Sequence, residues 1–473
     1  MSTETRKNLI IGSGEAGKYL AWYFGKIGEK STVIERRWIG GSCPNINCLP
    51  SKNEIWSAKV ADLVHHSRQF GSKAGSGTVD MAIVRERKRK MVESDVAAHM
   101  ELYQQAGTEL IMGEAKFTGP GTVEIKLNDG GTRTLQAERI FLNLGTHAAI
   151  PPAVADCRPL THIEALELDE VPAHFIVLGS GYIGLEFAQA MRRFGSNVTV
   201  IGRNPRLLAT EDDDVSDGVH RLFADEHIDL VLNAKVTQVS GKSGESVTVH
   251  FEKNSSGGQK IVEGSHLLVA TGRTPNTQGI GLELAGVQLA ANGYIKTDEH
   301  LATTASGIWA IGEVAGSPMF THVSIDDFRV VHASLTGGKR VTTGRKVPFC
   351  LFIDPELARY GLSEKEAQAQ NTSYRLFKIP MEAVMRATTM AETRGFLKAL
   401  VAAKSDEILG FTAFGAGAAE IMTSVQIAMS AGMPYTTLRD TILTHPTLVE
   451  GLSPLFTSTP KLHHAPANRA ASV

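Results

Sequence analysis

Short apolar runs followed by glycine-rich turns occur twice along this chain. Residues 8–17 read NLIIGSGEAG and residues 175–184 read FIVLGSGYIG, so each block passes from an apolar run through G-x-G-x-x-G into a helix-like stretch. A second apolar run follows each block, STVIE at 31–35 and NVTVIG at 197–202. The repeated pattern predicts two β-α-β units with parallel strands.

The glycines of the two turns share one register, 167 residues apart, as from position 12 to position 179. The first glycine of such a turn allows a tight bend, the second lets the backbone approach a pyrophosphate, and the third lets helix and strand pack closely. The phosphates then lie at a helix N-terminus, where unpaired N–H groups and the helix dipole favour anions. Two complete units therefore predict two dinucleotide sites. The predicted contacts are Gly12, Gly14, Gly17, Gly179, Gly181 and Gly184.

A β-meander is predicted in each unit, before its last strand. Residues 122–146 have the pattern of a hairpin around an Asn-Asp-Gly-Gly turn, and residues 246–264 repeat that pattern. From about residue 346 the chain has its own strands and helices. The predicted fold class is therefore α/β, with two Rossmann-like dinucleotide-binding domains, each a parallel sheet with an inserted β-meander, followed by a C-terminal α+β domain.

Composition narrows the classes of partner. The chain has 473 residues and a formal net charge of -2, which favours several domains and gives no reason to expect nucleic acid or an anionic membrane as a partner. We interpret the basic run at 85–90 as a solvated helix face. No apolar run reaches the length of a membrane helix, and the N-terminus lacks a signal-peptide pattern, so we expect a cytoplasmic protein.

The four cysteines include one close pair, Cys43 and Cys48, directly after the first nucleotide unit. Pro50 suits the first turn of a helix, which would place Cys48 near a helix N-terminus and favour its thiolate. Buried structural cysteines, half of a zinc site and chance are the competing interpretations. No further zinc ligands lie nearby in the sequence, and the neighbouring dinucleotide unit favours a redox pair. We expect Cys157 and Cys350 to be structural.

Taken together, these motifs resemble the class I pyridine nucleotide–disulfide oxidoreductases, a family that includes lipoamide dehydrogenase, glutathione reductase and mercuric reductase. The resemblance covers residues 7–457 and implies FAD as cofactor. It implies that Cys43 is the interchange thiol that meets substrate and that Cys48 is the charge-transfer thiol facing the flavin. It also implies that Lys52 lies beside the flavin N5 and pairs with Glu186.

The resemblance also implies further cofactor contacts. Tyr182 corresponds to the gate over the nicotinamide pocket, and Glu35 to the residue that holds the adenosine ribose of FAD. Glu313 stands where the family normally carries Asp, and its carboxylate can still accept hydrogen bonds from ribityl hydroxyls. The remaining expected FAD contacts are Gly41, Ser42, Gly145, Gly272 and Arg273.

Near the C-terminus the sequence HPTLVE contains His445 and Glu450. The family has this pattern as a catalytic dyad that reaches across a dimer interface. By resemblance, His445 is the acid/base serving Cys43 of the partner subunit, Glu450 orients it, and the chain forms a homodimer with a shared active site. Disulfide exchange needs such a group, because a proton must leave one thiol and reach the departing one.

The implied domain order has five segments. The expected bounds are 1–150 for the first part of the FAD-binding domain, 151–275 for the NAD(P)H-binding domain, 276–345 for the return to the FAD-binding domain, 346–460 for the dimerisation domain and 461–473 for a disordered tail.

The end of the second strand of the second unit indicates which nicotinamide cofactor is used. An acidic residue there normally holds the 2′-hydroxyl of NAD, but this chain has Gly202. Arg203 follows and Arg206 comes soon after, and cations without a carboxylate suit the 2′-phosphate of NADP. We therefore expect NADPH, with NADH as the alternative.

The acceptor is less constrained by the sequence. The block PMFTHVSIDDFRVV at 318–331 and the closing segment around HPTLVEGL are most similar to the mercuric-reductase-like branch, linked to oxidant and metal stress. We expect a small oxidant, a disulfide or a soft metal ion as electron acceptor at Cys43 and Cys48, and no resident metal. The alternatives are lipoamide dehydrogenase or another low-molecular-weight disulfide reductase, and a redox-sensing flavoprotein without fast turnover.

Overall fold

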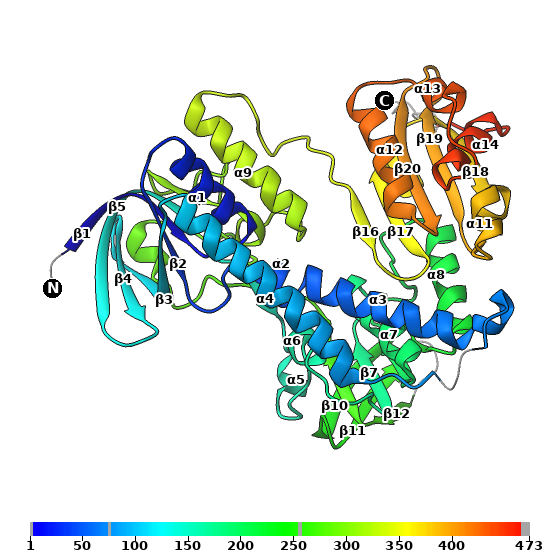
Figure 1. Cartoon of the computed structure of the whole chain (residues 1–473), viewed down its shortest axis with the longest axis horizontal. Helices are drawn as coiled ribbons and strands as arrows, with labels where there is room; N and C mark the ends of the chain where they lie inside the picture. The colour runs from blue at the N-terminus through cyan, green and yellow to red at the C-terminus, as the bar shows by residue number, and fades with distance from the viewer. Residues whose placement is uncertain (1–2, 74–76, 254–257, 465–473) are drawn as a thin grey trace, which may run out of the picture. The chain divides into compact units, whose positions relative to one another are not determined.

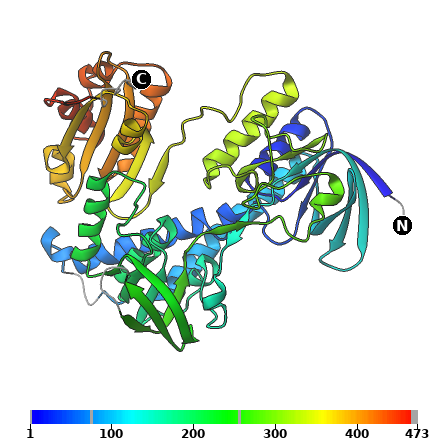
Figure 2. The same ribbon diagram turned by 180° about the vertical axis from the view of Figure 1, so that it is seen from behind.

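The computed structural model describes residues 3–73, 77–253 and 258–464, and Figures 1 and 2 show its elements from opposite sides. The chain divides into two compact units. The first unit comprises Met1–Ser57, Val79–Val171 and Leu268–Arg345, and the second comprises Ala58–Thr78, Pro172–Leu267 and Lys346–Val473.

The first unit is built on a sheet that combines parallel strands with a meander. β1 pairs in parallel with β2 and with β5, and β3, β4 and β5 form the antiparallel meander expected from the sequence. The strands are β1 (Thr3–Ile11), β2 (Ser31–Glu35), β3 (Glu109–Gly119), β4 (Thr122–Leu127), β5 (Thr132–Leu142) and β15 (Ile308–Ala310). A separate two-stranded antiparallel sheet is formed by β6 (Thr146–Ala148) and β14 (Arg273–Pro275).

Helices of the first unit begin at the turns that carry the motifs. α1 starts directly after the first glycine turn, and α3 starts at the second cysteine of the pair. The helices are α1 (Glu15–Lys26), α2 (Ser42–Asn45), α3 (Cys48–His65, whose residues after Ser57 belong to the second unit), α4 (Met81–Gln105), α5 (Pro152–Ala155), α6 (His162–Ala165) and α9 (Thr321–Thr336). Pro50 stands in the first turn of α3, so the expected helix start near Cys48 is confirmed.

The nucleotide part of the second unit repeats the pattern. A parallel sheet in the order β13-β7-β8-β9 carries α7, and a separate antiparallel sheet of β10, β11 and β12 is the second meander, green in Figure 2. The elements are β7 (His174–Leu178), α7 (Tyr182–Phe194), β8 (Asn197–Ile201), α8 (Asp213–Asp225), β9 (Asp229–Val231), β10 (Ala234–Lys242), β11 (Ser246–Lys253), β12 (Gln259–Gly264) and β13 (His266–Val269).

The C-terminal part of the second unit is an antiparallel sheet with α12 packed against β17 and β20 (Figure 1). Its strands are β16 (Phe349–Leu351), β17 (Glu356–Gly361), β18 (Tyr374–Pro380), β19 (Phe396–Ala402), β20 (Ile408–Gly415) and β21 (Lys461–His463). Its helices are α10 (Glu364–Ala369), α11 (Met385–Thr389), α12 (Ala418–Ser430), α13 (Tyr435–Asp440) and α14 (Leu452–Thr457). These sheets and helices confirm the predicted fold class.

Two expectations about local structure were wrong in part. The predicted disordered tail from residue 461 instead begins with β21, which pairs with β18 and stacks the His463 ring on Tyr374 at 4.8 Å. Residues 465–473 lie outside the described residues. On α4 the basic run is only partly solvated, because Lys88 is buried and its ammonium reaches the Glu167 carboxylate at 2.7 Å.

Glu54, on α3, is a buried carboxylic acid near this lysine. Its side chain is 3% exposed, and its Oε1 has no hydrogen-bond partner among the residues that the structure describes. Burial raises the pKa of Glu54 from an ordinary value of 4.5 to about 8, with Lys88 opposing the shift and Glu167 adding to it. The folded chain therefore binds this proton more tightly than the unfolded chain does.

Glu54→Gln removes an ionisation that opposes folding. The stabilising contribution of protonated Glu54 is complete below pH 4.5 and is lost as the pH rises through about 8. Between these values the wild type should lose about 1.4 kcal/mol of stability per pH unit relative to the variant. Urea unfolding near pH 5 and near pH 7 measures the difference, with the exposed Glu93→Gln on α4 as control. A Glu54→Gln offset that stays constant with pH would contradict this account.

Candidate active site

The two thiols of the redox pair lie together in the first unit. Cys43 is in α2 and Cys48 is the first residue of α3, and both are free thiols. The two side chains are hydrogen-bonded to each other, and the Thr321 hydroxyl lies 3.2 Å from the Cys48 sulfur and also bonds Cys43. Thr321 is the first residue of α9, so the pair lies close to the N-terminal ends of two helices, α3 and α9.

Ionisation of the pair is uneven. The pKa of the Cys43 thiol is held above its ordinary value, first by its hydrogen bond to Cys48 and then by burial, while Thr321 opposes the shift. The direction of this shift favours keeping the proton on Cys43. Helix N-termini and a hydroxyl donor stabilise a thiolate at that position. The arrangement can therefore hold one negative charge on Cys48 and keep Cys43 ready for exchange.

The N-terminus of α1 has the shape of a pyrophosphate cradle. A Cβ added to Gly12 would lie 2.3 Å from the Asn143 carbonyl oxygen, and one added to Gly14 would lie 2.7 Å from the Asn143 amide. Gly41 has φ +80, and its Cβ would lie 2.5 Å from the Gly14 Cα. The N-cap residue of α1 is Gly14, which has no side chain to cap the first turn; the Ala16 N–H bonds the Ser324 hydroxyl at 3.2 Å, and the helix N-terminus still favours an anion. These features fit FAD.

Close packing explains the third glycine of each turn. A Cβ on Gly17 would lie 2.6 Å from the Gly12 carbonyl oxygen, and one on Gly184 would lie 2.2 Å from that of Gly179. Helix and strand approach one another here at backbone distance. Gly181, by contrast, has nothing within 4 Å of its Cβ position, so the N-terminus of α7 is open to a ligand.

Glu35 ends β2 and is buried under the first turn. One carboxylate oxygen accepts hydrogen bonds from the Ser13 N–H at 2.9 Å and the Ser13 hydroxyl at 2.7 Å. The other accepts from the Arg37 and Trp38 N–H groups at 2.8 and 3.0 Å. Glu35 thus orders the turn, and its expected contact with the adenosine ribose stays a prediction.

Glu313 forms a clasp with Arg273, another expected flavin contact, and with Thr146, which the sequence did not single out. The Thr146 hydroxyl donates a hydrogen bond to its carboxylate, and the Arg273 guanidinium lies 3.5 Å from it. Arg273 in turn donates to the Thr146 hydroxyl at 2.6 Å. Gly145 and Gly272 directly precede Thr146 and Arg273 in the chain. Both have positive φ and nothing within 4 Å of their Cβ positions, so the backbone there is accessible to a cofactor.

The two arginines that follow Gly202 in the second unit differ in their ion pairs. A Cβ on Gly202 would lie 2.8 Å from the Ser180 hydroxyl, so an acidic side chain there would displace Ser180. Arg206 is half-buried and pairs with Asp217 and Asp213. Arg203 is exposed and forms no ion pair among the described residues.

Three further predicted residues lie on α3 and α7. Lys52 is one turn after Cys48 on α3. Glu186 is buried on α7 and accepts a hydrogen bond from the Phe352 N–H at 2.9 Å. Tyr182, the first residue of α7, stacks on Phe349 with ring centroids 5.4 Å apart. The pairing of Lys52 with Glu186 stays a prediction.

His445 and Glu450 form the expected dyad. The His445 Nδ1 lies 3.0 Å from both carboxylate oxygens of Glu450, and the imidazole is 65% exposed. The hydrogen bond between the Glu450 carboxylate and Nδ1 orients the ring, and Nε2 is left to exchange a proton with another group.

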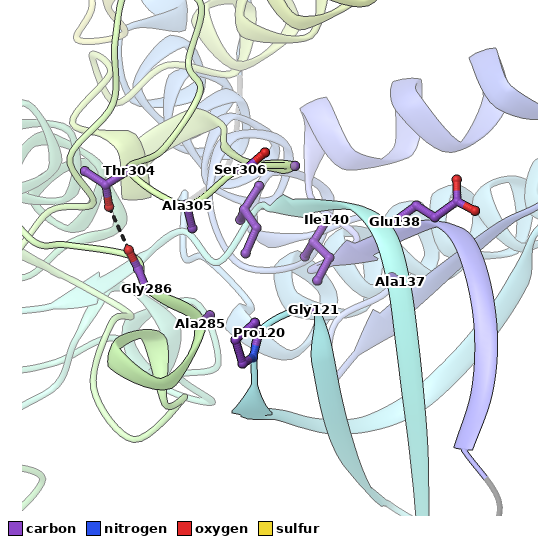
Figure 3. A pocket seen from close by; sticks show the side chains of 12 residues that line it. Pro120, Gly121, Ala137, Glu138, Ile140, Ala285, Gly286, Thr304, Ala305 and Ser306 are labelled. Atoms are coloured by element: carbon purple, nitrogen blue, oxygen red, sulfur yellow. Dashed lines mark hydrogen bonds between the residues drawn. The ribbon is translucent and has the colours of Figure 1, made fainter.

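Two other features of the chain are not part of this site. Asp212, Asp214 and Glu364 have carboxylate oxygens within 4.8 Å of one another, but the buried Lys398 ammonium lies among them at 2.8, 2.8 and 3.0 Å. We interpret the cluster as an internal ion-pair network. A pocket of about 280 Å³ in the first unit is lined by residues around β5 and β15, among them Glu138 and Ile140, with the Thr304 hydroxyl bonded to the Gly286 carbonyl (Figure 3). None of the predicted site residues lines it.

Sequence reasoning missed several residues that shape the site. Thr321 and Asn143 are the clearest, since one contacts both sulfurs and the other packs on the first glycine turn. Thr321 lies within the block at 318–331 that resembles the mercuric-reductase-like branch, but no local pattern distinguishes it from its neighbours.

Comparison with known proteins gives one family over almost the whole chain. Residues 6–327 match the family described as pyridine nucleotide-disulphide oxidoreductase, and residues 347–455 match its dimerisation domain. The second match covers the strands from β16 to β20 of the C-terminal sheet.

Curated relatives and a solved structure agree with these matches. The chain is 35% identical over 461 residues to the probable pyridine nucleotide-disulfide oxidoreductase RclA of Escherichia coli, covering 95% of this chain and 98% of that protein. It is 31% identical to the mercuric reductase of Staphylococcus aureus (94% and 80% covered) and 32% identical to the mitochondrial dihydrolipoyl dehydrogenase of Dictyostelium discoideum (95% and 93%). A Cu(II) complex of RclA, described as an HOCl-induced flavoprotein disulfide reductase, superposes with a TM-score of 0.87 at 32% identity, covering 96% of this chain and 99% of that one.

The structure contains no helix long and apolar enough to cross a membrane among the residues it describes. The glycine cradles, the paired thiols and the comparisons agree: the chain belongs to the FAD-dependent pyridine nucleotide-disulfide oxidoreductases and is an enzyme of that class.

Proposed function

We propose that this enzyme is a homodimer that takes electrons from NADPH and delivers them through the Cys43 and Cys48 pair to a soft metal ion, a small oxidant or a disulfide. The observation that carries the proposal is the hydrogen-bonded thiol pair at two helix N-termini, with Thr321 beside both sulfurs. Two thiols suit soft metals as well as disulfides.

The names of the relatives support this class of acceptor. The S. aureus relative is named for mercuric reduction, and the E. coli relative was solved as a Cu(II) complex and described as HOCl-induced. Lipoamide is the alternative acceptor, in line with the dihydrolipoyl dehydrogenase relative, but Gly202 stands where that enzyme normally has the NAD-type acid. A panel of acceptors tested with the FAD-loaded protein separates these, and reduction by NADPH without turnover of any acceptor would favour a redox sensor.

When bound, FAD supplies the hydride and electron-pair chemistry that connects the nicotinamide to the sulfurs. The residues proposed to hold it are the cradle glycines, Glu35, and the clasp of Thr146, Arg273 and Glu313. The protein's contribution is to position the two cofactors and to control which sulfur is charged.

The thiol chemistry then follows from the uneven ionisation. An electron pair and one proton convert the disulfide into the Cys43 thiol and the Cys48 thiolate. Cys43 loses its proton to His445 of the partner subunit and attacks one sulfur of a disulfide acceptor, and the leaving thiolate takes that proton back. Cys48 then attacks Cys43, which releases the second half of the acceptor and restores the disulfide. Glu450 holds the His445 ring throughout.

Cys43→Ser tests the proposed acceptor site. The variant should lose reduction of disulfides and of Cu²⁺ or Hg²⁺ by about 10³-fold or more, because the exchange nucleophile is missing. Slow electron leak to oxygen or quinones should remain, since it does not need Cys43. NADPH oxidation with each acceptor measures both activities, and Cys157→Ser, which alters a buried thiol bonded to the Val154 carbonyl, is the control. Undiminished disulfide and metal turnover in Cys43→Ser would remove Cys43 from the mechanism.

Arg203→Ala tests the proposed cofactor preference. Arg203 is exposed, whereas Arg206 is held by two aspartates. Loss of one charge-assisted bond to the 2′-phosphate should lower kcat/KM for NADPH by roughly 10-fold or more and leave kcat/KM for NADH nearly unchanged. Arg206→Ala is the matched comparison and should have the smaller effect. A wild-type preference for NADH, or equal losses with both cofactors in Arg203→Ala, would contradict the assignment.

A further inference from the structure

One face of α7 runs along a short segment of the C-terminal sheet in the second unit. Four residues of α7, each about one turn after the last, contact three residues of this segment, Phe349, Phe352 and Asp354. These helix residues are Tyr182, Glu186, Gln189 and Arg193. The two residues that the family resemblance assigns to the cofactor region, Tyr182 and Glu186, therefore rest on β16 and the residues that follow it.

The C-terminal half of α7 is held firmly against this segment. Gln189 donates to the Asp354 carbonyl oxygen at 2.9 Å and accepts from the Asp354 N–H at 2.7 Å. Arg193 donates to the Asp354 carboxylate at 2.6 Å, and both side chains are buried. Separation of α7 from the segment at this end would break two hydrogen bonds between the Gln189 side chain and the Asp354 backbone, and an ion pair.

The N-terminal end of α7 makes a contact of a different kind. The Tyr182 and Phe349 rings are stacked, with centroids 5.4 Å apart and planes inclined by 20°. Rotation of the Tyr182 side chain can break such a stack without moving α7 or breaking a backbone hydrogen bond. The ring can therefore change orientation while the helix that carries it stays fixed.

The Phe349 ring is itself backed by a fixed charge. Arg359, directly opposite Phe349 in the β16–β17 pair, holds its guanidinium 5.2 Å from the ring centroid. That guanidinium is bonded to Glu211 at 2.9 Å and to Glu366 at 2.6 Å, so it is not free to leave the ring. A planar cation over an aromatic face is favourable and restricts the ring.

We propose that Phe349, backed by Arg359, is a positioning residue that sets the orientation of Tyr182 and thereby the affinity for the nicotinamide nucleotide. This rests on the proposed function, in which Tyr182 covers the nicotinamide pocket. Phe349 acts through Tyr182 and has no part in the thiol chemistry. Edge strand β16 of the C-terminal sheet thus contributes to the affinity of the nucleotide site.

A double-mutant cycle on the FAD-loaded dimer tests this inference. Phe349→Leu should raise the Kd for NADP⁺ roughly 3- to 10-fold, the size expected for an aromatic pair. It should raise the KM for NADPH similarly while kcat with a disulfide acceptor stays within about twofold. In a Tyr182→Leu background the same substitution should leave the Kd for NADP⁺ unchanged.

Two results would overturn the proposal. One is an unchanged Kd in Phe349→Leu, and the other is an equal rise in Kd with and without the Tyr182 ring, which is the behaviour of a purely structural residue. Phe349→Tyr keeps the stack and should bind NADP⁺ like the wild type, which separates loss of stacking from damage to the core. Failure of the proposed function would be seen separately, in wild-type protein whose flavin is not reduced by NADPH.

Discussion

The whole arrangement depends on where one negative charge resides. Two thiols separated by four residues share a hydrogen bond, and the proposed function places the charge on Cys48, because that residue begins α3 and lies 3.2 Å from the hydroxyl that begins α9. Helix N-termini and a hydroxyl donor favour a thiolate in this position. The hydrogen bond to Cys48 and then burial raise the pKa of the Cys43 thiol. The division of labour proposed for the two sulfurs follows from this asymmetry.

Local patterns in the sequence were enough to predict the parts whose physics is local. Glycine turns between strand and helix, the start of α3 at Cys48 and the two meanders each depend on residues close in the chain, and the structure has them all. The fold class followed from their repetition. The dyad of His445 and Glu450 is also local, since five residues span it.

The remaining parts depend on contacts that no local pattern encodes. Thr321 meets Cys48 across 273 positions of sequence, and Lys398 meets Asp212 across 186. Both arginines after Gly202 have the charge that a phosphate needs, and only their partners distinguish them, because Arg206 is already paired with Asp217 and Asp213. Many charged residues of this chain form ion pairs with one another. A charged residue that is exposed near a glycine turn, such as Arg203, is therefore the better candidate for binding a ligand.

The most direct test of the central claim is anaerobic titration of the FAD-loaded protein with NADPH, followed by absorbance. The account predicts that at the two-electron stage a long-wavelength band appears, produced by the Cys48 thiolate beside oxidised flavin, and that Cys48→Ser abolishes it. Bleaching of the flavin by the first equivalent of NADPH, with no such band in the wild type, would show that the electrons do not reach the sulfurs and would contradict the account.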